Sequence, residues 1–249
     1  MKKNVISINI NYGEINFYID KIKDLIKKKQ PSYVCFSNVH MTIEAYDDEY
    51  FCNVVNSANF AFPDGLPIAK SLNILYNIKQ KRIAGMDFLP MFLETCNNLK
   101  YKVAFVGSTE EVLNLVEQRI ETNYKGIEIT NLISPPFNEK WNNEDYINKI
   151  NSSKTDVVFV ALGCPKQENW MFENYKYINS TLFGIGGALP TFVGKVKRAP
   201  NWMQKFGLEW LYRLIQEPKR MAKRYFYTNS KFLFLLTKAW LRINKKSIE

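Results

Sequence analysis

Histidine is almost absent from this 249-residue chain, which contains only His40, and cysteine is rare, with four residues. The cysteines form no Cys-x-x-Cys pair and no cluster with histidine. A His- or Cys-based metal site and a histidine-dependent catalytic triad are therefore disfavoured. In a reducing cytosol the cysteines are expected to remain free thiols rather than to form structural disulfides.

Long hydrophobic runs are also missing. The best candidate, FLFLLTKAWL from Phe232, is about half of the roughly 18 apolar residues that a membrane-spanning helix needs. The N-terminus, MKKNVISINI, has a short and interrupted apolar run without a small-residue cleavage site, which predicts a first strand rather than a signal peptide. The sequence shows no internal repeat. These features predict a cytoplasmic protein.

Acidic residues are scarce in the last part of the chain. Between Lys195 and Glu249 there are 14 Lys and Arg residues but only three Asp and Glu residues, whereas the first 194 residues are nearly neutral. The same segment holds three of the five tryptophans. Basic residues interleaved with aromatic ones suit a negatively charged surface, which is either nucleic acid or anionic lipid.

Apolar, β-rich runs alternate with helical patterns through the first 190 residues, which is typical of an α/β fold. The 46% hydrophobic content suffices for a large core. We therefore predict a Rossmann-like, mostly parallel sheet flanked by helices. Strands are predicted at 4–10, 32–38, 59–62, 102–108, 156–162 and 180–186, and helices at 17–29, 86–99 and 108–123. Ser108 followed by Glu111 predicts a capping box for the last of these helices.

The pattern changes near Pro200, after which only helices are predicted, with a separation near Pro218. We therefore divide the chain into an α/β core, residues 1–198, and a basic, aromatic helical appendage, residues 199–249.

One carboxylate stands out at the end of a predicted strand. Asp64 follows the run NFAF and lies between Pro63 and Gly65. Pro, Asp and Gly are common turn residues, so Asp64 could be a plain turn-former. Ligands of open α/β sheets, however, bind beyond the carboxyl ends of the strands, where Asp64 could be reactive.

Other strand ends carry groups suited to an anionic ligand. VGS (106–108) ends a strand and opens a helix, where free backbone N–H groups can bind phosphate. ALGCPKQENW (161–170) places Lys166, Gln167 and Glu168 at a helix start, although Glu168 could merely complement the helix dipole. GIGGALPTFVGKVKRAP (184–200) joins four glycines to three cations.

Two further features have simple structural alternatives. Arg82 and Asp87, in RIAGMD, could form a surface ion pair of little energetic weight. Asn38, at the end of a strand, could be a helix cap.

Two familiar motifs are missing. No Asp-x-Asp triplet occurs, so a diphosphate chelated by a metal in that manner is unsupported. No G-x-G-x-x-G stands between a strand and a helix, which disfavours classical NAD binding.

Six ordered blocks together resemble the WecG/TagA/CpsF family of bacterial glycosyltransferases over residues 4 to 230. They are PDGLPIAK, RIAGMD, VGS, GCPKQE, GGALPTFVGKVKRAPNWMQ and GLEWLYRLIQEPKRMAKRY. The resemblance implies inverting, metal-independent transfer of a sugar to an undecaprenyl-diphosphate-linked saccharide during polysaccharide synthesis at the inner face of the membrane. The donor would be a UDP-sugar, such as UDP-N-acetylmannosamine, its uronic acid or another hexose. No cofactor is implied.

The resemblance also assigns roles to residues. It makes Asp64 the general base, and places Arg213, Arg220 and Arg224 of the appendage beside the acceptor diphosphate or UDP. A helix break at Pro218 would leave the arrangement of Arg213 and Arg220 open. With the strand-end groups, the predicted donor site comprises Asn38, Arg82, Asp87, Gly107, Ser108, Gly163, Gln167, Glu168, Gly186 and Gly187.

The appendage would dock on an anionic membrane surface, and because some relatives self-associate, a homo-oligomer is among the implied partners. One position departs from the family. Many relatives carry a threonine where this chain has Phe36, and Ser37 follows, so the donor sugar is left open.

Two alternative functions remain at this point. A nucleic-acid-binding module would use the basic tail, but it gives Asp64 and the GCPKQE block no role, and nucleic acid is not the expected partner. A Rossmann-type oxidoreductase would need the missing nucleotide fingerprint.

Overall fold

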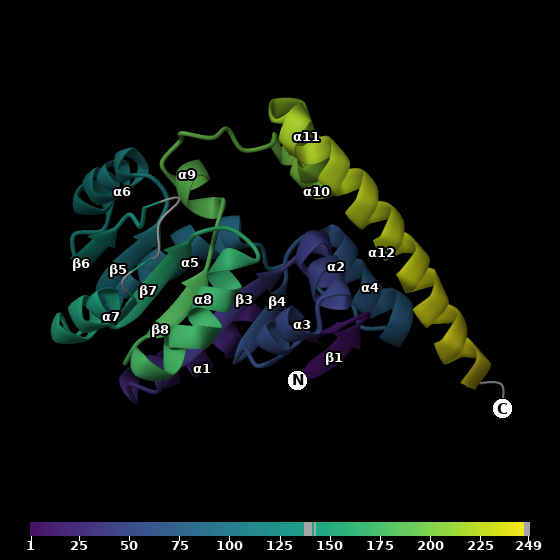
Figure 1. Ribbon diagram of the computed structural model, residues 1–249, viewed down its shortest axis with the longest axis horizontal. Coiled ribbons are helices and arrows are strands. Elements are labelled where there is room, and N and C mark those ends of the chain that lie inside the picture. Colours follow the sequence, from purple (N-terminus) through teal and green to yellow (C-terminus); the bar gives the residue numbers. More distant parts are fainter. Residues whose placement is uncertain (137–140, 142, 247–249) are drawn as a thin grey trace.

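The computed structural model describes residues 1–136, 141 and 143–246. Its centre is a six-stranded parallel sheet with the spatial order β4, β3, β8, β7, β5, β6. Helices cover both faces of this sheet (Figure 1). The predicted α/β fold with a mostly parallel sheet is confirmed.

Five of the predicted strands are present close to their expected bounds. They are β3 (Ser32–Ser37), β4 (Phe60–Pro63), β5 (Lys102–Gly107), β7 (Val157–Ala161) and β8 (Thr181–Gly184). All five are largely buried, which is why their apolar runs were so continuous.

One predicted strand was wrong, and one strand was not predicted. The run at 4–10 is a hairpin of β1 (Lys2–Val5) and β2 (Ile8–Asn11) outside the main sheet, and Ile6, with a φ of 63°, turns the chain between them. The edge strand β6 (Glu128–Ile133) was missed because its mostly half-exposed residues, EITNLI, mix polar and apolar side chains without a buried run.

Side chains of alternate strand residues point to opposite faces of the sheet and pack into two separate cores, one on each face. Tyr33 and Cys35 pack on one side with α2, α3 and α4, and Val34 and Phe36 pack on the other with α1, α5 and α6. The helices up to residue 192 are α1 (Ile15–Lys27), α2 (Val39–Asp47), α3 (Glu49–Asn56), α4 (Leu66–Tyr76), α5 (Gly85–Leu99), α6 (Glu110–Asn123), α7 (Asn143–Ser152), α8 (Lys166–Asn174) and α9 (Ala188–Phe192).

The predicted capping box at Ser108 is wrong. Thr109 caps α6, and its side chain accepts a hydrogen bond from Val112 N at 3.4 Å. Ser108 has a φ of 69° and belongs to the turn between β5 and α6. All four cysteines are free, as predicted.

Three helices follow residue 200, namely α10 (Asn201–Phe206), α11 (Glu209–Gln216) and α12 (Pro218–Lys246). The predicted break near Pro218 is confirmed, because this proline begins α12. The long helix α12 packs along α2 and α4 (Figure 1) and adds Phe232, Leu235 and Leu236 to one of the two cores. Of the helices described, none combines the length and the apolar character needed to traverse a bilayer.

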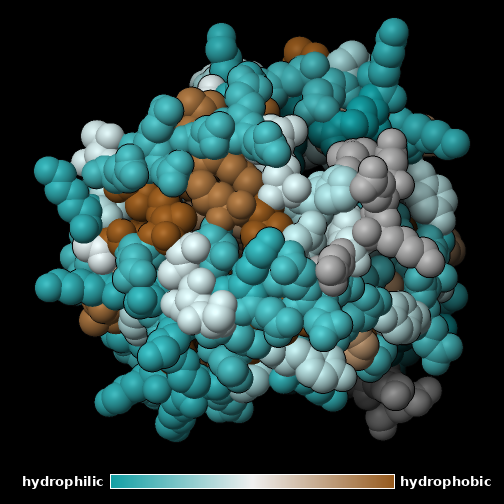
Figure 2. All heavy atoms as spheres, turned by 60° about the vertical axis from the view of Figure 1, so that its left-hand side comes forward, coloured by the Kyte–Doolittle hydropathy of each residue, from teal (hydrophilic) through white to brown (hydrophobic). Residues whose placement is uncertain are grey.

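The side of the molecule with β6 and α6 is mainly hydrophilic (Figure 2). One apolar area interrupts this surface, bordered by hydrophilic side chains. The buried apolar side chains form the two cores, and further exposed apolar side chains lie on the C-terminal helices.

Candidate active site

Asp64 lies at the carboxyl end of β4, in the short turn before α4. Its backbone N–H donates to Ser37 O at 2.9 Å, and Ile83 N donates to Pro63 O at 2.8 Å. These bonds attach the turn to the end of β3 on one side and to the segment before α5 on the other. The position of the Asp64 carboxylate is therefore set by the backbone of three segments.

The electrostatic environment of Asp64 is unusual. Removal of the side chain from solvent raises its pKa to about 6, and Asp87 acts in the same direction, while Arg213, Arg82 and Arg198 act to lower the pKa. Among the described residues, the carboxylate has no hydrogen bond or ion pair. A partly buried carboxylate with a pKa near 6 and free oxygens is suited to accept a proton.

A cavity of about 530 Å³ opens beside Asp64, at the carboxyl ends of the strands. This is a size typical of small-molecule sites. Ten predicted site residues line it: Asn38, Asp64, Ser108, Gly163, Gln167, Gly186, Gly187, Arg213, Arg220 and Arg224. Four do not line it, namely Arg82, Asp87, Gly107 and Glu168.

Gln167 is the most firmly oriented polar side chain of this cavity. Its Oε1 accepts from Gly163 N at 3.2 Å, and its Nε2 donates to Glu168 Oε1 at 2.6 Å. Gly186 leaves room for it, because a Cβ there would lie 3.1 Å from Gln167 Oε1. Two of the Gln167 amide's bonding positions are thus occupied, and the second Nε2 hydrogen has no partner among the described residues.

Glu168 is completely buried, so it is not an exposed residue that merely complements the helix dipole. Burial raises the pKa of Glu168 to about 7. Its Oε2 has no hydrogen-bond partner among the described residues. Glu168 does not line the cavity, but it accepts a hydrogen bond from Gln167, which does.

Asn38 caps α2, as one of its two interpretations predicted. Its side-chain oxygen accepts from Met41 N at 3.1 Å, and the residue also lines the cavity. A role as a helix cap and a position in the cavity wall are therefore compatible for Asn38.

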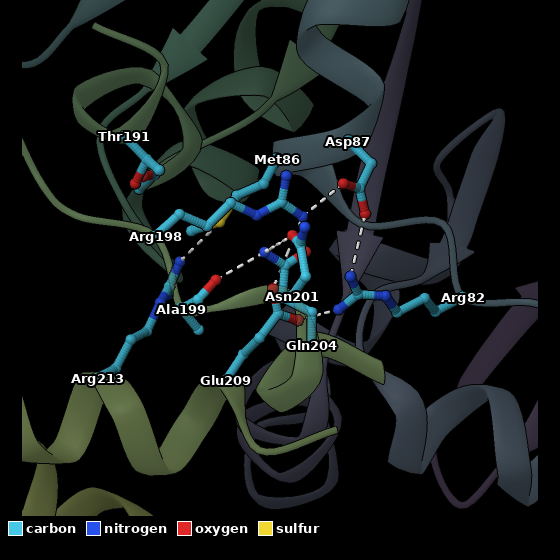
Figure 3. A network of polar contacts seen from close by, with 11 residues as sticks. Arg82, Met86, Asp87, Thr191, Arg198, Ala199, Asn201, Gln204, Glu209 and Arg213 are labelled. Carbon is cyan, nitrogen blue, oxygen red and sulfur yellow. Dashed lines mark hydrogen bonds and ion pairs between the residues drawn. The ribbon is translucent and has the colours of Figure 1, made fainter. Parts of the chain in front are cut away.

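Arg82 and Asp87 form the predicted ion pair, with 3.3 Å between Arg82 Nη2 and Asp87 Oδ2. The pair is part of a larger network of four alternating charges with Arg198 and Glu209 (Figure 3). The network joins α5 to α11 beside the cavity. The roles of Arg198 and Glu209 could not be predicted, because their partners Asp87 and Arg82 lie more than a hundred residues away in the chain.

The three arginines of the appendage converge on one cavity although they come from two helices. Arg213 belongs to α11, and Arg220 and Arg224 belong to α12. Arg213 Nη2 lies 3.7 Å from Met86 Sδ, and it points from α11 toward the core (Figure 3). The helix break at Pro218 does not prevent Arg213 and Arg220 from facing the same space.

Sequence reasoning missed several lining residues. His40 lies two residues after Asn38 and lines the cavity, and burial together with Arg224 lowers its pKa to about 4. Thr109 and Trp141 also line it, and so does Lys166, which the sequence had indicated as a cation at the start of a helix. The only signal for His40 was its position just after a strand end.

The cavity thus brings the Asp64 carboxylate together with three arginines. Comparison with known proteins shows the family of the chain. A sequence model described as the Glycosyl transferase WecG/TagA/CpsF family matches residues 3–246. The chain belongs to this family and is a glycosyltransferase.

Two relatives bear the name N-acetylglucosaminyldiphosphoundecaprenol N-acetyl-beta-D-mannosaminyltransferase. The protein of Bacillus subtilis (strain 168) is 32% identical over 222 residues, which cover 88% of this chain and 84% of the relative. That of Staphylococcus aureus (strain MW2) is 24% identical over 247 residues, covering 98% and 95%. Family membership favours a glycosyltransferase over the nucleic-acid-binding module and the oxidoreductase.

Proposed function

We propose that this protein transfers a sugar from a UDP-sugar to an undecaprenyl-diphosphate-linked saccharide, with inversion and without a metal ion. The sugar is N-acetylmannosamine, its uronic acid, or a related hexose or hexuronic acid. The names of the relatives support N-acetylmannosamine and an acceptor that ends in diphosphate-linked N-acetylglucosamine.

The observation that carries the proposal is the free Asp64 carboxylate beside a cavity lined by three arginines. Asp64 takes the proton from the acceptor hydroxyl while that oxygen attacks the anomeric carbon. The bond from the anomeric carbon to the UDP oxygen breaks, and UDP leaves with the electron pair.

The leaving diphosphate gains negative charge, which a fixed set of cations and N–H donors can stabilise. Arg213, Arg220 and Arg224 supply cations, and the N-terminus of α6 supplies backbone N–H groups beside Ser108 and Thr109. The Gln167 amide supplies a further donor. These groups support a mechanism in which no metal ion is needed.

We further propose that residues 199–249 bind peripherally to the inner face of the cell membrane. Exposed apolar side chains on α12, including Phe226, Leu233 and Phe234, support this, together with the cations of the same helix. Cationic segments gain roughly 1 kcal/mol per Lys or Arg near an anionic leaflet. This location would bring the cavity to a lipid-linked acceptor.

The test is a UDP-release assay with a panel of UDP-sugars, anionic vesicles and a GlcNAc-diphosphate-lipid acceptor. We expect acceptor-dependent turnover of one donor, a product of inverted anomeric configuration by NMR, and no loss of turnover in EDTA. Asp64→Asn should lower kcat by roughly 10²- to 10⁴-fold. Full activity of Asp64→Asn, or no turnover of any donor on any lipid-diphosphate acceptor, contradicts the proposal.

A further inference from the structure

A second, smaller cavity also borders Asp64. Its volume is about 180 Å³, and it is enclosed by the turn at 64–67, the start of α2 and the helices α11 and α12. Its walls therefore come from both the α/β core and the C-terminal helices.

The two cavities meet at a shared set of residues. Asn38, His40, Asp64, Arg213 and Arg224 line both of them. In an in-line displacement, the attacking oxygen approaches the anomeric carbon from the side opposite to the leaving diphosphate. A UDP-sugar in the larger cavity would thus receive its acceptor from the smaller one, and Asp64 borders both spaces.

The smaller cavity differs from the larger one in its chemistry. It has an aromatic wall, in which Trp210 and Tyr225 meet edge to face with 5.9 Å between ring centroids. The Trp210 side chain is not fully covered, since 38% of the residue's surface is exposed. Aromatic faces of this kind pack against the C–H faces of sugar rings, and the indole N–H remains available to a polar group.

Apart from Asp64 and Arg213 and Arg224, which it shares with the larger cavity, and Glu209, the polar side chains of the smaller cavity are neutral. Asn229 contributes an amide, and His40 is uncharged at neutral pH because burial and Arg224 lower its pKa to about 4. Glu209 is occupied by its ion pairs with Arg82 and Arg198. Away from the charged residues that the two cavities share, these walls suit an uncharged part of a ligand that is rich in hydroxyl groups.

We propose that the smaller cavity binds the acceptor sugar, with Trp210 as its stacking wall and His40 and Asn229 as hydrogen-bonding partners. This inference rests on the proposed function, and it assigns the acceptor's terminal sugar to a space separate from the nucleotide cavity. Arg213 and Arg224 then lie between the two substrates.

The test compares Trp210→Ala and Trp210→Phe with the wild type, and uses Tyr177→Ala as the control. Tyr177 is an exposed aromatic residue of the α/β core that lines neither cavity and lies outside the C-terminal helices. We expect Trp210→Ala to raise the acceptor KM at least tenfold, while the donor KM and the Kd for UDP change less than twofold. Trp210→Phe should restore most of the acceptor affinity, and Tyr177→Ala should change neither KM.

A fluorescence measurement tests acceptor binding to the smaller cavity in the absence of the transfer reaction. With UDP at saturation, a short-chain GlcNAc-diphosphate-lipid should quench the tryptophan fluorescence of the wild type, and this response should be absent in Trp210→Phe. Because this binding measurement uses only the wild type and Trp210→Phe, it still tests the proposal if Trp210→Ala fails to fold.

The outcomes separate the two proposals. No acceptor-dependent turnover by the wild type contradicts the proposed function, whereas turnover with an unchanged acceptor KM in Trp210→Ala contradicts only the subsite. An equal rise of the donor KM, or quenching that persists in Trp210→Phe, also overturns the assignment of the cavity.

Discussion

Arg82 forms an ion pair with Glu209, a residue 127 positions later in the chain. The two side chains are only 18% and 23% exposed, and Asp87 and Arg198 complete an alternating set of charges around them (Figure 3). Because Glu209 is in the first turn of α11 and Arg213 follows one turn later, this pair helps to set where Arg213 meets the cavity.

The first prediction concerns the energy of this pair. A double-mutant cycle of Arg82→Gln and Glu209→Gln should give a coupling free energy of about 1 kcal/mol, near the upper end for surface pairs, because the network is partly buried. The measurement is urea unfolding. The exposed pair of Lys102 and Glu128, 2.9 Å apart, is the control and should couple by less than about 0.5 kcal/mol. Equal coupling in both pairs contradicts the special role of the network.

The contrast between the main sheet and this network shows what sequence can predict. The buried strands β3, β5, β7 and β8 were predictable because both of their faces are covered and their apolar runs are continuous. The edge strand β6 has no such run. The hairpin of β1 and β2 turns at Ile6, which has a positive φ, and because this residue is not a glycine the sequence did not indicate a turn there. The positions of residues at strand ends and the family resemblance together identified ten residues that line one cavity.

Contacts between distant segments could not be predicted. Nothing in the local sequence connects Arg82 to Glu209, or places His40 near Arg224. These relationships depend on how α11 and α12 dock, which follows from tertiary packing rather than from local propensity. The catalytic and binding roles assigned to the site residues stay predictions.

The second prediction concerns the pH dependence of catalysis. A base works only when deprotonated, and burial raises the pKa of Asp64 to about 6. The value of kcat/KM should therefore rise with pH and reach half of its plateau near pH 6. Arg213 acts to lower this pKa, so Arg213→Gln should move the acidic limb to higher pH in addition to reducing the plateau. The check is a pH profile from 5 to 8, and a limb that stays in place or moves to lower pH contradicts the assignment of Asp64.

The third prediction concerns Glu168 and stability. The pKa of this carboxyl rises from 4.5 to about 7 on folding, so the native state keeps a proton that the unfolded chain releases. Its contribution to the free energy of unfolding is therefore largest below about pH 4.5 and is lost as pH rises to about 7. Glu168→Gln retains an acceptor for Gln167 Nε2 but cannot titrate.

Urea unfolding between pH 4.5 and 8 measures this effect. The wild type should lose on the order of 3 kcal/mol relative to Glu168→Gln across that range. Glu173→Gln, an exposed position on the same helix, should follow the wild type. Parallel curves for the wild type and Glu168→Gln contradict the prediction.

The fourth prediction concerns two glycines near the strand ends. It compares the energetic cost of a positive φ with the cost of a steric clash of an added Cβ atom. Gly107 and Gly163 have φ values of 101° and 80°. A Cβ at Gly107 would lie 2.7 Å from the backbone of Ala161, while nothing lies within 4 Å of one at Gly163. Gly163→Ala should cost about 1–2 kcal/mol for its conformation alone. Gly107→Ala should cost clearly more, because β5 and β7 must move apart, and equal losses in thermal unfolding disprove this reasoning.

The last prediction concerns the apolar face of α12. Phe234 is 66% exposed and lies beside Leu233 and Leu241, with Lys238 and Arg242 at the edge of the same surface. Water-exposed side chains in this arrangement gain most by entering a lipid interface while the cations stay at the headgroups. Because burying a phenylalanine side chain contributes about 1.5–3 kcal/mol, Phe234→Ser should weaken binding to anionic vesicles by roughly tenfold or more.

Co-sedimentation with vesicles of anionic and of neutral lipids measures this binding. Phe17→Ser is the matched control, because Phe17 is 52% exposed but lies on α1, away from the C-terminal helices. It should bind as the wild type does, and binding of both should fall with added salt, since screening weakens the cationic contribution. If Phe234→Ser and Phe17→Ser bind equally well, α12 is not the surface that meets the lipid. If Phe234→Ser loses binding to neutral vesicles but not to anionic ones, the cations of α12 are sufficient for binding to anionic lipid, and the apolar side chains are needed only when the lipid is neutral.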